Sequence, residues 1–282
     1  MRRFKEGEVI LLLGAAGGVG TAVAEAAARE GARLHLVDLG TEIDGSGSAP
    51  ERVEDLASKL RGGGAEASAV ALDLRERGAA REAISGCINE YGRLDAIIQC
   101  AGAHDDAPIQ RLDEEIFGRI LDLSVGLAFA LIKEGAKAFT EAKRPGSIVL
   151  SLGPEALLGA ARKAHLAAAS GALFGLIRSS AIDLRRWSVR INGVAPTART
   201  RVNEDHPLFR GISSQSLSAS AVAPLYLYLA SSLSEELSGE ILGVAGGHIY
   251  ALSGRESRGV YSEDAHLEID EIAERIDEIT RF

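Results

Sequence analysis

The chain has 282 residues, of which 46% are hydrophobic, enough for a large core, and an α/β chain of this length often folds as one domain. Its net charge of −9 argues against a nucleic-acid or anionic-membrane partner. No run of 18 apolar residues occurs in the sequence, so we expect no membrane-spanning helix. Two isolated cysteines, Cys87 and Cys100, provide neither a disulfide framework nor a metal site, and they favour a cytoplasmic protein with reduced thiols.

A glycine-rich turn lies near the start of the chain, in the stretch Val9–Gly20, which reads V-I-L-L-L-G-A-A-G-G-V-G. An apolar run of strand length ends at Gly14, and a helical pattern opens at Gly18. Because free N–H groups at a helix N-terminus attract phosphate, this order predicts a dinucleotide site. Gly14 would permit the tight turn, Gly18 the approach of the pyrophosphate, and Gly20 close packing of the helix on the strand. The spacing differs from G-x-G-x-x-G, so a turn without a ligand is the alternative.

The second predicted strand, Arg33–Val37, ends at Asp38, which lies 24 residues after Gly14. This spacing is typical of the acidic residue that binds the adenosine ribose. A carboxylate there would repel a 2′-phosphate, and the glycine turn contains no Lys or Arg. The sequence therefore predicts NAD rather than NADP as the cofactor. A solvated aspartate at the end of a strand is the alternative interpretation.

Strand and helix patterns continue to alternate along the chain, which predicts right-handed crossovers and a parallel sheet covered by helices on both faces. The expected fold is therefore a Rossmann-type, doubly wound α/β domain of about seven strands. Further strands are predicted at Ala67–Leu72, Leu94–Gln99, Ser147–Leu152, Val189–Val194 and Glu240–Val244. Helices are predicted at Thr21–Arg29, Arg52–Leu60, Glu76–Tyr91, Pro108–Ala142, Lys163–Leu184 and Ala219–Ala230.

Several predicted strands end in short turns, and the carboxyl ends of parallel strands meet at one edge of a sheet, where ligands bind. We therefore expect the cofactor to contact the glycine turn, the aspartate that follows the second strand, and the turns after three later strands. The predicted cofactor-binding residues are Gly14, Gly18, Val19, Gly20, Asp38, Leu39, Asp73, Leu74, Cys100, Ala101, Gly102, Pro196 and Thr197.

Two regions near the C-terminus stand apart from this pattern. The segment Thr200–Ser218 is polar, irregular and long enough to form a substrate loop. The tail Ser262–Phe282 is acidic, and its isoleucines repeat at helical spacing, so its apolar stripe should dock on the body or on a partner subunit. We therefore divide the chain into a dinucleotide-binding domain, 1–254, and an acidic helical extension, 255–282.

These motifs together resemble the short-chain dehydrogenase/reductase family over nearly the whole chain. The resemblance is carried by the glycine turn, Asp73-Leu74, Cys100-Ala101-Gly102 in place of Asn-Ala-Gly, Gly146–Val149 and Arg190–Pro196. The loop after Asp38 and the segment Val222–Leu225 further resemble the (R)-3-hydroxyacyl-CoA dehydrogenase domains of peroxisomal multifunctional enzymes. The resemblance implies an NAD(P)-binding domain that is usually a dimer or tetramer.

The resemblance also implies four catalytic positions, and this chain departs from the family at each of them. The family uses a Tyr as general acid/base, a Lys four residues later that lowers the pKa of this Tyr, a Ser that steadies the substrate oxygen, and an Asn that holds a water molecule. Local pattern aligns these with Leu166, Ser170, Gly153 and Ser124, respectively. Leu166 cannot transfer a proton, and Ser170 cannot supply a positive charge.

Neighbouring residues could replace the missing groups. Lys163 lies one turn before Leu166 on the same helix face, whereas His165 points about 100° away around the helix. Ser151 shares a strand face with Gly153, and His104 and Asp105 follow the Cys100–Gly102 turn. Ordinary core or surface roles are the alternative for each of these residues.

The leading hypothesis is thus an NAD-binding family member that has lost ordinary hydride transfer. One alternative is an active NAD(P)-dependent oxidoreductase that acts on a hydroxyacyl or ketoacyl substrate through non-standard acid/base residues. Another is a structural subunit that pairs with an active relative. The small-residue face of Lys163–Leu184 predicts either an internal helix contact or the interface of a homodimer or homotetramer.

Overall fold

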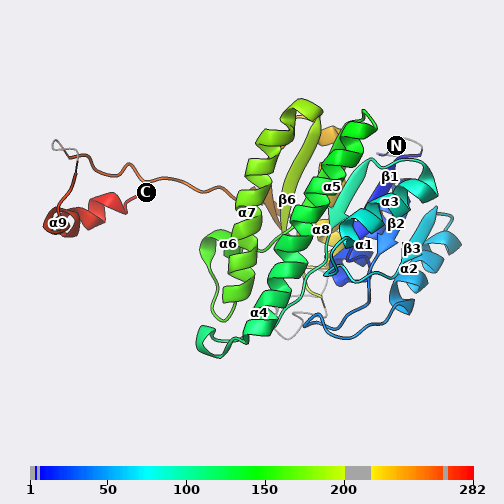
Figure 1. Cartoon of the computed structure of the whole chain (residues 1–282), viewed down its shortest axis with the longest axis horizontal. Coiled ribbons are helices and arrows are strands. Elements are labelled where there is room, and N and C mark those ends of the chain that lie inside the picture. The colour runs from blue at the N-terminus through cyan, green and yellow to red at the C-terminus, as the bar shows by residue number, and fades with distance from the viewer. Residues whose placement is uncertain (1–3, 5–6, 201–216, 263–265) are drawn as a thin grey trace. The chain divides into compact units, whose positions relative to one another are not determined.

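The computed structural model describes residues 4, 7–200, 217–262 and 266–282. Its contacts divide the chain into two compact units, Met1–Leu252 and Ser253–Phe282, which we describe separately (Figure 1). Most of the segment expected to form a substrate loop, residues 201 to 216, lies outside the described residues. None of the helices in the described ranges is long and apolar enough to cross a membrane.

The first unit is built on a single sheet, to which the described residues contribute eight strands in the order β3-β2-β1-β4-β5-β6-β7-β8. These are β1 (Val9–Leu13), β2 (Arg33–Val37), β3 (Ala67–Val70), β4 (Ala96–Gln99), β5 (Gly146–Ser151), β6 (Val189–Thr197), β7 (Ile241–Ala245) and β8 (His248–Ala251). Strands β1 to β7 are parallel, and the strand order reverses between β1 and β4. The predicted Rossmann-type α/β fold is confirmed, and the reversal is where such sheets bind ligands.

The eighth strand, β8, is absent from the sequence-based prediction. It pairs antiparallel with β7 through the Gly246-Gly247 turn, where Gly246 has a φ of +56°. Most of its residues are exposed, so it lacks the apolar run that identifies the other strands. The His248 ring stacks on Tyr250 at 5.0 Å between ring centroids, and the Tyr250 ring lies over Gly243 of β7.

Helices cover both faces of the sheet (Figure 1). They are α1 (Gly18–Arg29), α2 (Glu51–Gly62), α3 (Ala79–Tyr91), α4 (Glu114–Leu121), α5 (Leu127–Glu141), α6 (Glu155–Leu158), α7 (Ala164–Leu184) and α8 (Ala219–Ala230). Short 3-10 turns occupy Ile109–Arg111, Arg185–Trp187 and Ser232–Ser234. The single helix predicted over Pro108–Ala142 is interrupted by a π-helical turn, η2 (Asp122–Gly126), which joins α4 to α5.

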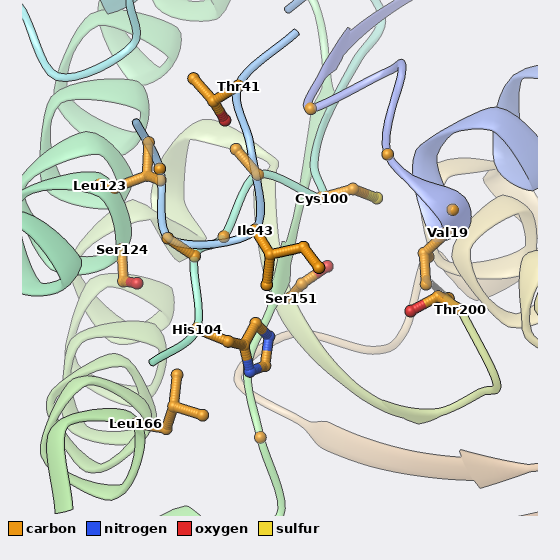
Figure 2. Close-up of a pocket in the computed structure, with 18 of the residues that line it drawn as sticks. Val19, Thr41, Ile43, Cys100, His104, Leu123, Ser124, Ser151, Leu166 and Thr200 are labelled. Atoms are coloured by element: carbon orange, nitrogen blue, oxygen red, sulfur yellow. The ribbon is translucent and has the colours of Figure 1, made fainter. Parts of the chain in front are cut away.

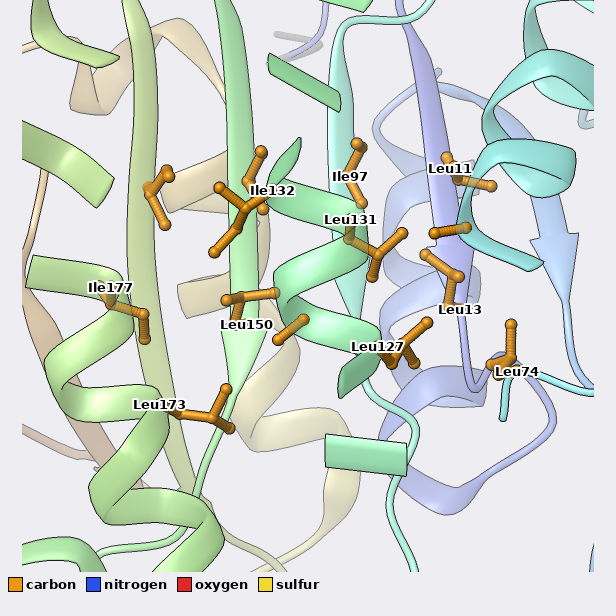
Figure 3. Close-up of a cluster of buried hydrophobic side chains, with 14 of the residues drawn as sticks. Leu11, Leu13, Leu74, Ile97, Leu127, Leu131, Ile132, Leu150, Leu173 and Ile177 are labelled. Carbon is orange, nitrogen blue, oxygen red and sulfur yellow. The ribbon is translucent and has the colours of Figure 1, made fainter. Parts of the chain in front are cut away.

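The sheet has an apolar core on each face, and β1 shows how its residues divide between them. Leu11 and Leu13 belong to the core beneath α3, α5 and α7, which Figure 3 shows, and Ile10 and Leu12 belong to the core beneath α1, α2 and α8. Successive side chains of a strand point to opposite faces. A strand buried on both faces is therefore apolar throughout, which is why these strands can be recognised from the sequence.

The second unit contains the predicted tail helix, α9 (Ile269–Ile279). The Glu268 and Glu271 side chains form a capping box at its start. The Ser257 hydroxyl donates to the Ile279 carbonyl at 2.5 Å, which ties the preceding segment to the end of the helix. Ile269, Ile272 and Ile276 are exposed within this unit, so the apolar stripe forms as predicted and its docking partner stays a prediction.

Candidate dinucleotide site and active site

A cavity of about 440 Å³ opens at the carboxyl ends of the parallel strands. It is bordered by α1, by the loop that follows β2 and by the ends of β4, β5 and β6 (Figure 2). Twelve of the thirteen predicted cofactor residues line it: Gly14, Gly18, Val19, Asp38, Leu39, Asp73, Leu74, Cys100, Ala101, Gly102, Pro196 and Thr197. Gly20 lies behind this wall, where a side chain would collide with the Gly14 carbonyl.

The glycine turn is shaped by close contacts that side chains would block. Gly14 has a φ of +75°, its N–H donates to the Val37 carbonyl at 2.9 Å, and a Cβ at this position would overlap the Ala101 backbone. A Cβ at Gly18 would lie 2.7 Å from the Thr200 methyl group, and Figure 2 shows Thr200 beside Val19 at this end of the cavity. Gly14 and Gly18 thus let two later segments of the chain approach the turn.

The Asp38 carboxylate joins the glycine turn to the loop after β2. Its Oδ2 accepts a hydrogen bond from the Ala16 N–H at 2.9 Å, and its Oδ1 accepts one from the Gly40 N–H at 2.7 Å. These bonds fix the orientation of the carboxylate on the cavity wall. Each of its oxygens keeps further acceptor capacity that can meet a ribose hydroxyl.

The loop of residues 40–49 crosses the cavity and is tied to its far side. The His104 N–H donates to the Ile43 carbonyl at 2.9 Å, and Arg75 Nη1 donates to the Gly45 carbonyl at 2.9 Å. Arg75 also pairs with Asp73 at 2.6 Å, and this hydrogen-bonded guanidinium lowers the pKa of Asp73. Sequence reasoning missed this arrangement, because only the folded chain brings Ile43 to the cavity.

The four predicted catalytic positions converge on the same cavity. Ser124 lies in the π-helical turn η2, a feature frequent at functional sites, and Gly153 follows β5. Leu166 and Ser170 project from α7, and Leu166 faces His104 in Figure 2. These four positions, far apart in the sequence, therefore line one cavity.

Comparison with known proteins agrees with this geometry. The family model described as Enoyl-(Acyl carrier protein) reductase matches residues 14–248. Short-chain dehydrogenase reductase 3c of Arabidopsis thaliana is 30% identical over 266 residues, covering 89% of this chain and 98% of that protein. The chain belongs to the short-chain dehydrogenase/reductase family.

Two further proteins to which the chain is similar have names that indicate a substrate or a cofactor. Hydroxyacyl-CoA dehydrogenase ChsB1 of Mycobacterium tuberculosis is 27% identical over 269 residues, covering 92% of this chain and 83% of that one. The crystal structure of carveol dehydrogenase from Mycobacterium avium in complex with NAD superposes with a TM-score of 0.77 at 26% identity, covering 88% of this chain and 99% of that one.

Two of the positions that the local sequence pattern aligns with the family's catalytic groups interact with each other. The Ser170 hydroxyl accepts a hydrogen bond from the Gly153 N–H at 2.8 Å, and Ser170 is 5% exposed. The Glu155 carboxylate fills the space that a side chain at residue 153 would occupy. Lys163 Nζ lies 3.9 Å from Glu155 Oε1 and 3.6 Å from Asp106 Oδ2. Glu155 was not predicted, although an acidic residue just after the strand end at Gly153-Pro154 is visible in the sequence.

The remaining candidate groups have environments that disfavour charge. Burial, with the nearby Lys163 charge, lowers the pKa of His104 to about 4, so its imidazole is neutral at pH 7. His165 is fully buried behind the cavity wall, and neither ring nitrogen has a hydrogen-bond partner in the described part of the chain. Burial also lowers the pKa of His165.

A buried phenol that sequence reasoning missed also reaches the cavity. Tyr226 of α8 is fully buried, and its hydroxyl lies 2.7 Å from the Ser151 hydroxyl. Burial raises the pKa of Tyr226 well above its usual value and that of Cys100 to about 12. The Tyr226 phenol is therefore neutral and hydrogen-bonded. Nothing in the sequence indicated its role, because Tyr226 lies within the apolar pattern of a core helix.

Proposed function

We propose that this chain is an NAD-binding short-chain dehydrogenase/reductase that lacks the family's ordinary, tyrosine-driven hydride transfer. The observation that carries the proposal is that Leu166, Ser170 and Gly153 line the cavity where a phenol, an ammonium and a hydroxyl would be needed. Reduction of a ketone produces an alkoxide that must be protonated, and positioned general acids contribute about 10²–10⁴-fold to such steps. A leucine at residue 166 supplies no proton.

The residues present fit a dinucleotide cofactor. Gly14 and Gly18 line the cavity at the N-terminus of α1, where side chains would collide with Ala101 and Thr200, and this end of a helix favours phosphate. Asp38 is held on the wall with acceptor capacity for ribose hydroxyls, which supports NAD over NADP. The similarity to a carveol dehydrogenase solved with NAD supports the same choice. When bound, a nicotinamide ring would supply hydride acceptor or donor chemistry.

Nearby groups do not replace the lost acid in this proposal. The Tyr226 phenol is fully buried, and its raised pKa makes it a poorer acid than the lysine-assisted tyrosine of the family. Lys163 lies between two carboxylates, and Ser151 is hydrogen-bonded to Tyr226. Binding of NAD by calorimetry, together with an assay of NADH oxidation by acetoacetyl-CoA, tests the proposal.

A second candidate is an active oxidoreductase with non-standard acid/base residues that acts on a hydroxyacyl or ketoacyl thioester. The observation in its favour is that Lys163, Glu155 and His104 all line the cavity near Leu166. The similarity to a hydroxyacyl-CoA dehydrogenase of Mycobacterium tuberculosis suggests the substrate class. Mutation of Lys163 or Glu155 separates this candidate from the first, because turnover would then depend on them.

We also propose that the chain assembles through α7, as a homodimer or homotetramer or as a structural partner of an active relative. Its outward face carries small exposed residues, Ala168, Ala172 and Gly175, and then Ile182, which is 77% exposed. Small side chains let a second helix approach closely. We further assign cofactor binding to residues 1–254 and treat residues 255–282 as a separate extension. The two free cysteines support a cytoplasmic location, where thiols stay reduced.

A further inference from the structure

We infer that the catalytic end of the cavity has reversed hydrogen-bonding polarity, so that it selects a ligand carrying a donor, an alcohol or a protonated amine, over a ketone. The inference deepens the proposed function and rests on its assumption that this cavity is the ligand site. In the family, two hydroxyl groups face the substrate oxygen. Here a carboxylate, Glu155, takes the place of one of them, and a leucine takes the place of the other.

The position of Glu155 is the first observation. It is the first residue of the short helix α6, and its carboxylate folds back over Gly153 into the volume of a missing side chain. The side chain is 16% exposed and lines the cavity. Among the described residues, no hydrogen bond to this carboxylate is present, and Lys163 Nζ lies 3.9 Å from its Oε1, so the carboxylate keeps acceptor capacity for a ligand. An ionised carboxylate accepts hydrogen bonds and donates none.

The surroundings of Glu155 do not restore a donor for a ketone. Lys163 is the nearest cation, but it lies between Glu155 and Asp106, at 3.9 and 3.6 Å, so a ketone would compete with two carboxylates for its ammonium group. This trio carries one net negative charge. A ligand ammonium would be attracted to that charge. A ketone oxygen would be repelled by the carboxylate, because both groups only accept hydrogen bonds.

The other polar groups near Glu155 distinguish less between an alcohol and a ketone. The hydroxyls of Ser124, Ser151 and Ser170 can each donate or accept, so they suit an alcohol and a ketone alike. His104, whose pKa is lowered to about 4, contributes a neutral imidazole that also offers one donor and one acceptor. Glu155 is therefore the residue whose chemistry sets the preference.

The experiment compares three probes that share one ring: cyclohexylamine, cyclohexanol and cyclohexanone. Their binding to the full chain is measured by ligand-observed NMR at neutral pH, with and without NAD. We expect the protonated amine to bind most tightly and the ketone least, since a hydrogen bond to a charged group is worth about tenfold in affinity or more. Glu155→Gln keeps the shape and removes the charge, so it should weaken amine binding about tenfold and leave ketone binding unchanged or tighter.

Two more variants sharpen the test. Glu82→Gln changes an exposed glutamate of α3 and should leave all three affinities as they are. Gly153→Ser must displace the Glu155 carboxylate and supplies a donor, so it should shift the preference toward the ketone. The inference is overturned if the ketone binds as tightly as the alcohol, if Glu155→Gln leaves amine binding unchanged, or if no probe binds at millimolar concentration. Failure of NAD to bind, with the probe order intact, would instead overturn the proposed function alone.

Discussion

The Ser170 hydroxyl accepts a hydrogen bond from the Gly153 backbone N–H at 2.8 Å, which joins two positions that the sequence pattern aligns with the family's catalytic lysine and serine. Here the two positions satisfy each other within the protein. The two residues therefore form a hydrogen-bonded local structure of their own.

Restoring the family's groups should restore some activity. We expect Gly153→Ser, Leu166→Tyr and Ser170→Lys together to give measurable NADH-dependent reduction of acetoacetyl-CoA. Leu166→Tyr alone should do little, because without a nearby cation at residue 170 the pKa of the new phenol is not lowered. Steady-state assays of the triple and single variants check this. Equal activity of the single and triple variants would contradict the assigned roles.

The Asp38 carboxylate should set the cofactor preference. We expect calorimetry to show tighter binding of NAD than of NADP, because a 2′-phosphate would be repelled by this carboxylate. Asp38→Ala should weaken NAD about tenfold, as expected for the loss of hydrogen bonds from a charged acceptor, and should weaken NADP less. Asp55→Ala, at an exposed position of α2, is the matched control. Tighter binding of NADP by the unmodified chain would refute the role of Asp38.

Protonation of His104 should make stability depend on pH. Burial lowers its pKa in the folded chain to about 4, from 6.5 in the unfolded chain. As the pH falls from 6.5 toward 4, the unfolded chain binds the proton first, so the free energy of unfolding decreases; above pH 6.5 the group has no effect. His104→Gln should flatten this decline in urea titrations across that range. Part of the decline in the free energy of unfolding should persist in this variant, because the pKa values of His35 and His165 are also lowered.

Assembly through α7 can be tested with a charge on its small-residue face. Ala172→Glu should convert the oligomer to a monomer in sedimentation at micromolar concentration, because it places a charge in a close helix contact. Ser85→Glu, at an exposed position of α3, should leave the assembly intact. Sedimentation of the unmodified chain as a monomer would show that this face is not an interface.

Twelve of the residues that we expect to bind the cofactor line one cavity because local spacing places them at the same edge of the sheet. Gly14 and Asp38 directly follow consecutive strands, and because those strands pair in parallel at Leu13 and Val37, the two residues must be neighbours. The fold class follows in the same way, from apolar runs that are buried on both faces of the sheet. The positions of Leu166 and Ser170 follow from helical spacing along α7.

The other end of the cavity is harder to predict, because some of its side chains come from positions that neither strand nor helix periodicity assigns to the site. Glu155 folds back over Gly153, and Tyr226 enters from a helix whose sequence looks like ordinary core. Neither contact follows from strand or helix periodicity. The π-helical turn at Ser124 and the exposed strand β8 were missed for the same reason, since tertiary contacts rather than apolar patterns define them.

The most direct test of the account is an NADH-oxidation assay with acetoacetyl-CoA and simple ketones, run on purified, unmodified protein whose NAD binding is measured by calorimetry in the same preparation. We predict that NAD binds and that no NADH-dependent reduction is detected, because Leu166 provides no proton. Robust turnover that Lys163→Ala, His165→Ala or Glu155→Gln abolishes would contradict the account and would establish a rewired active site.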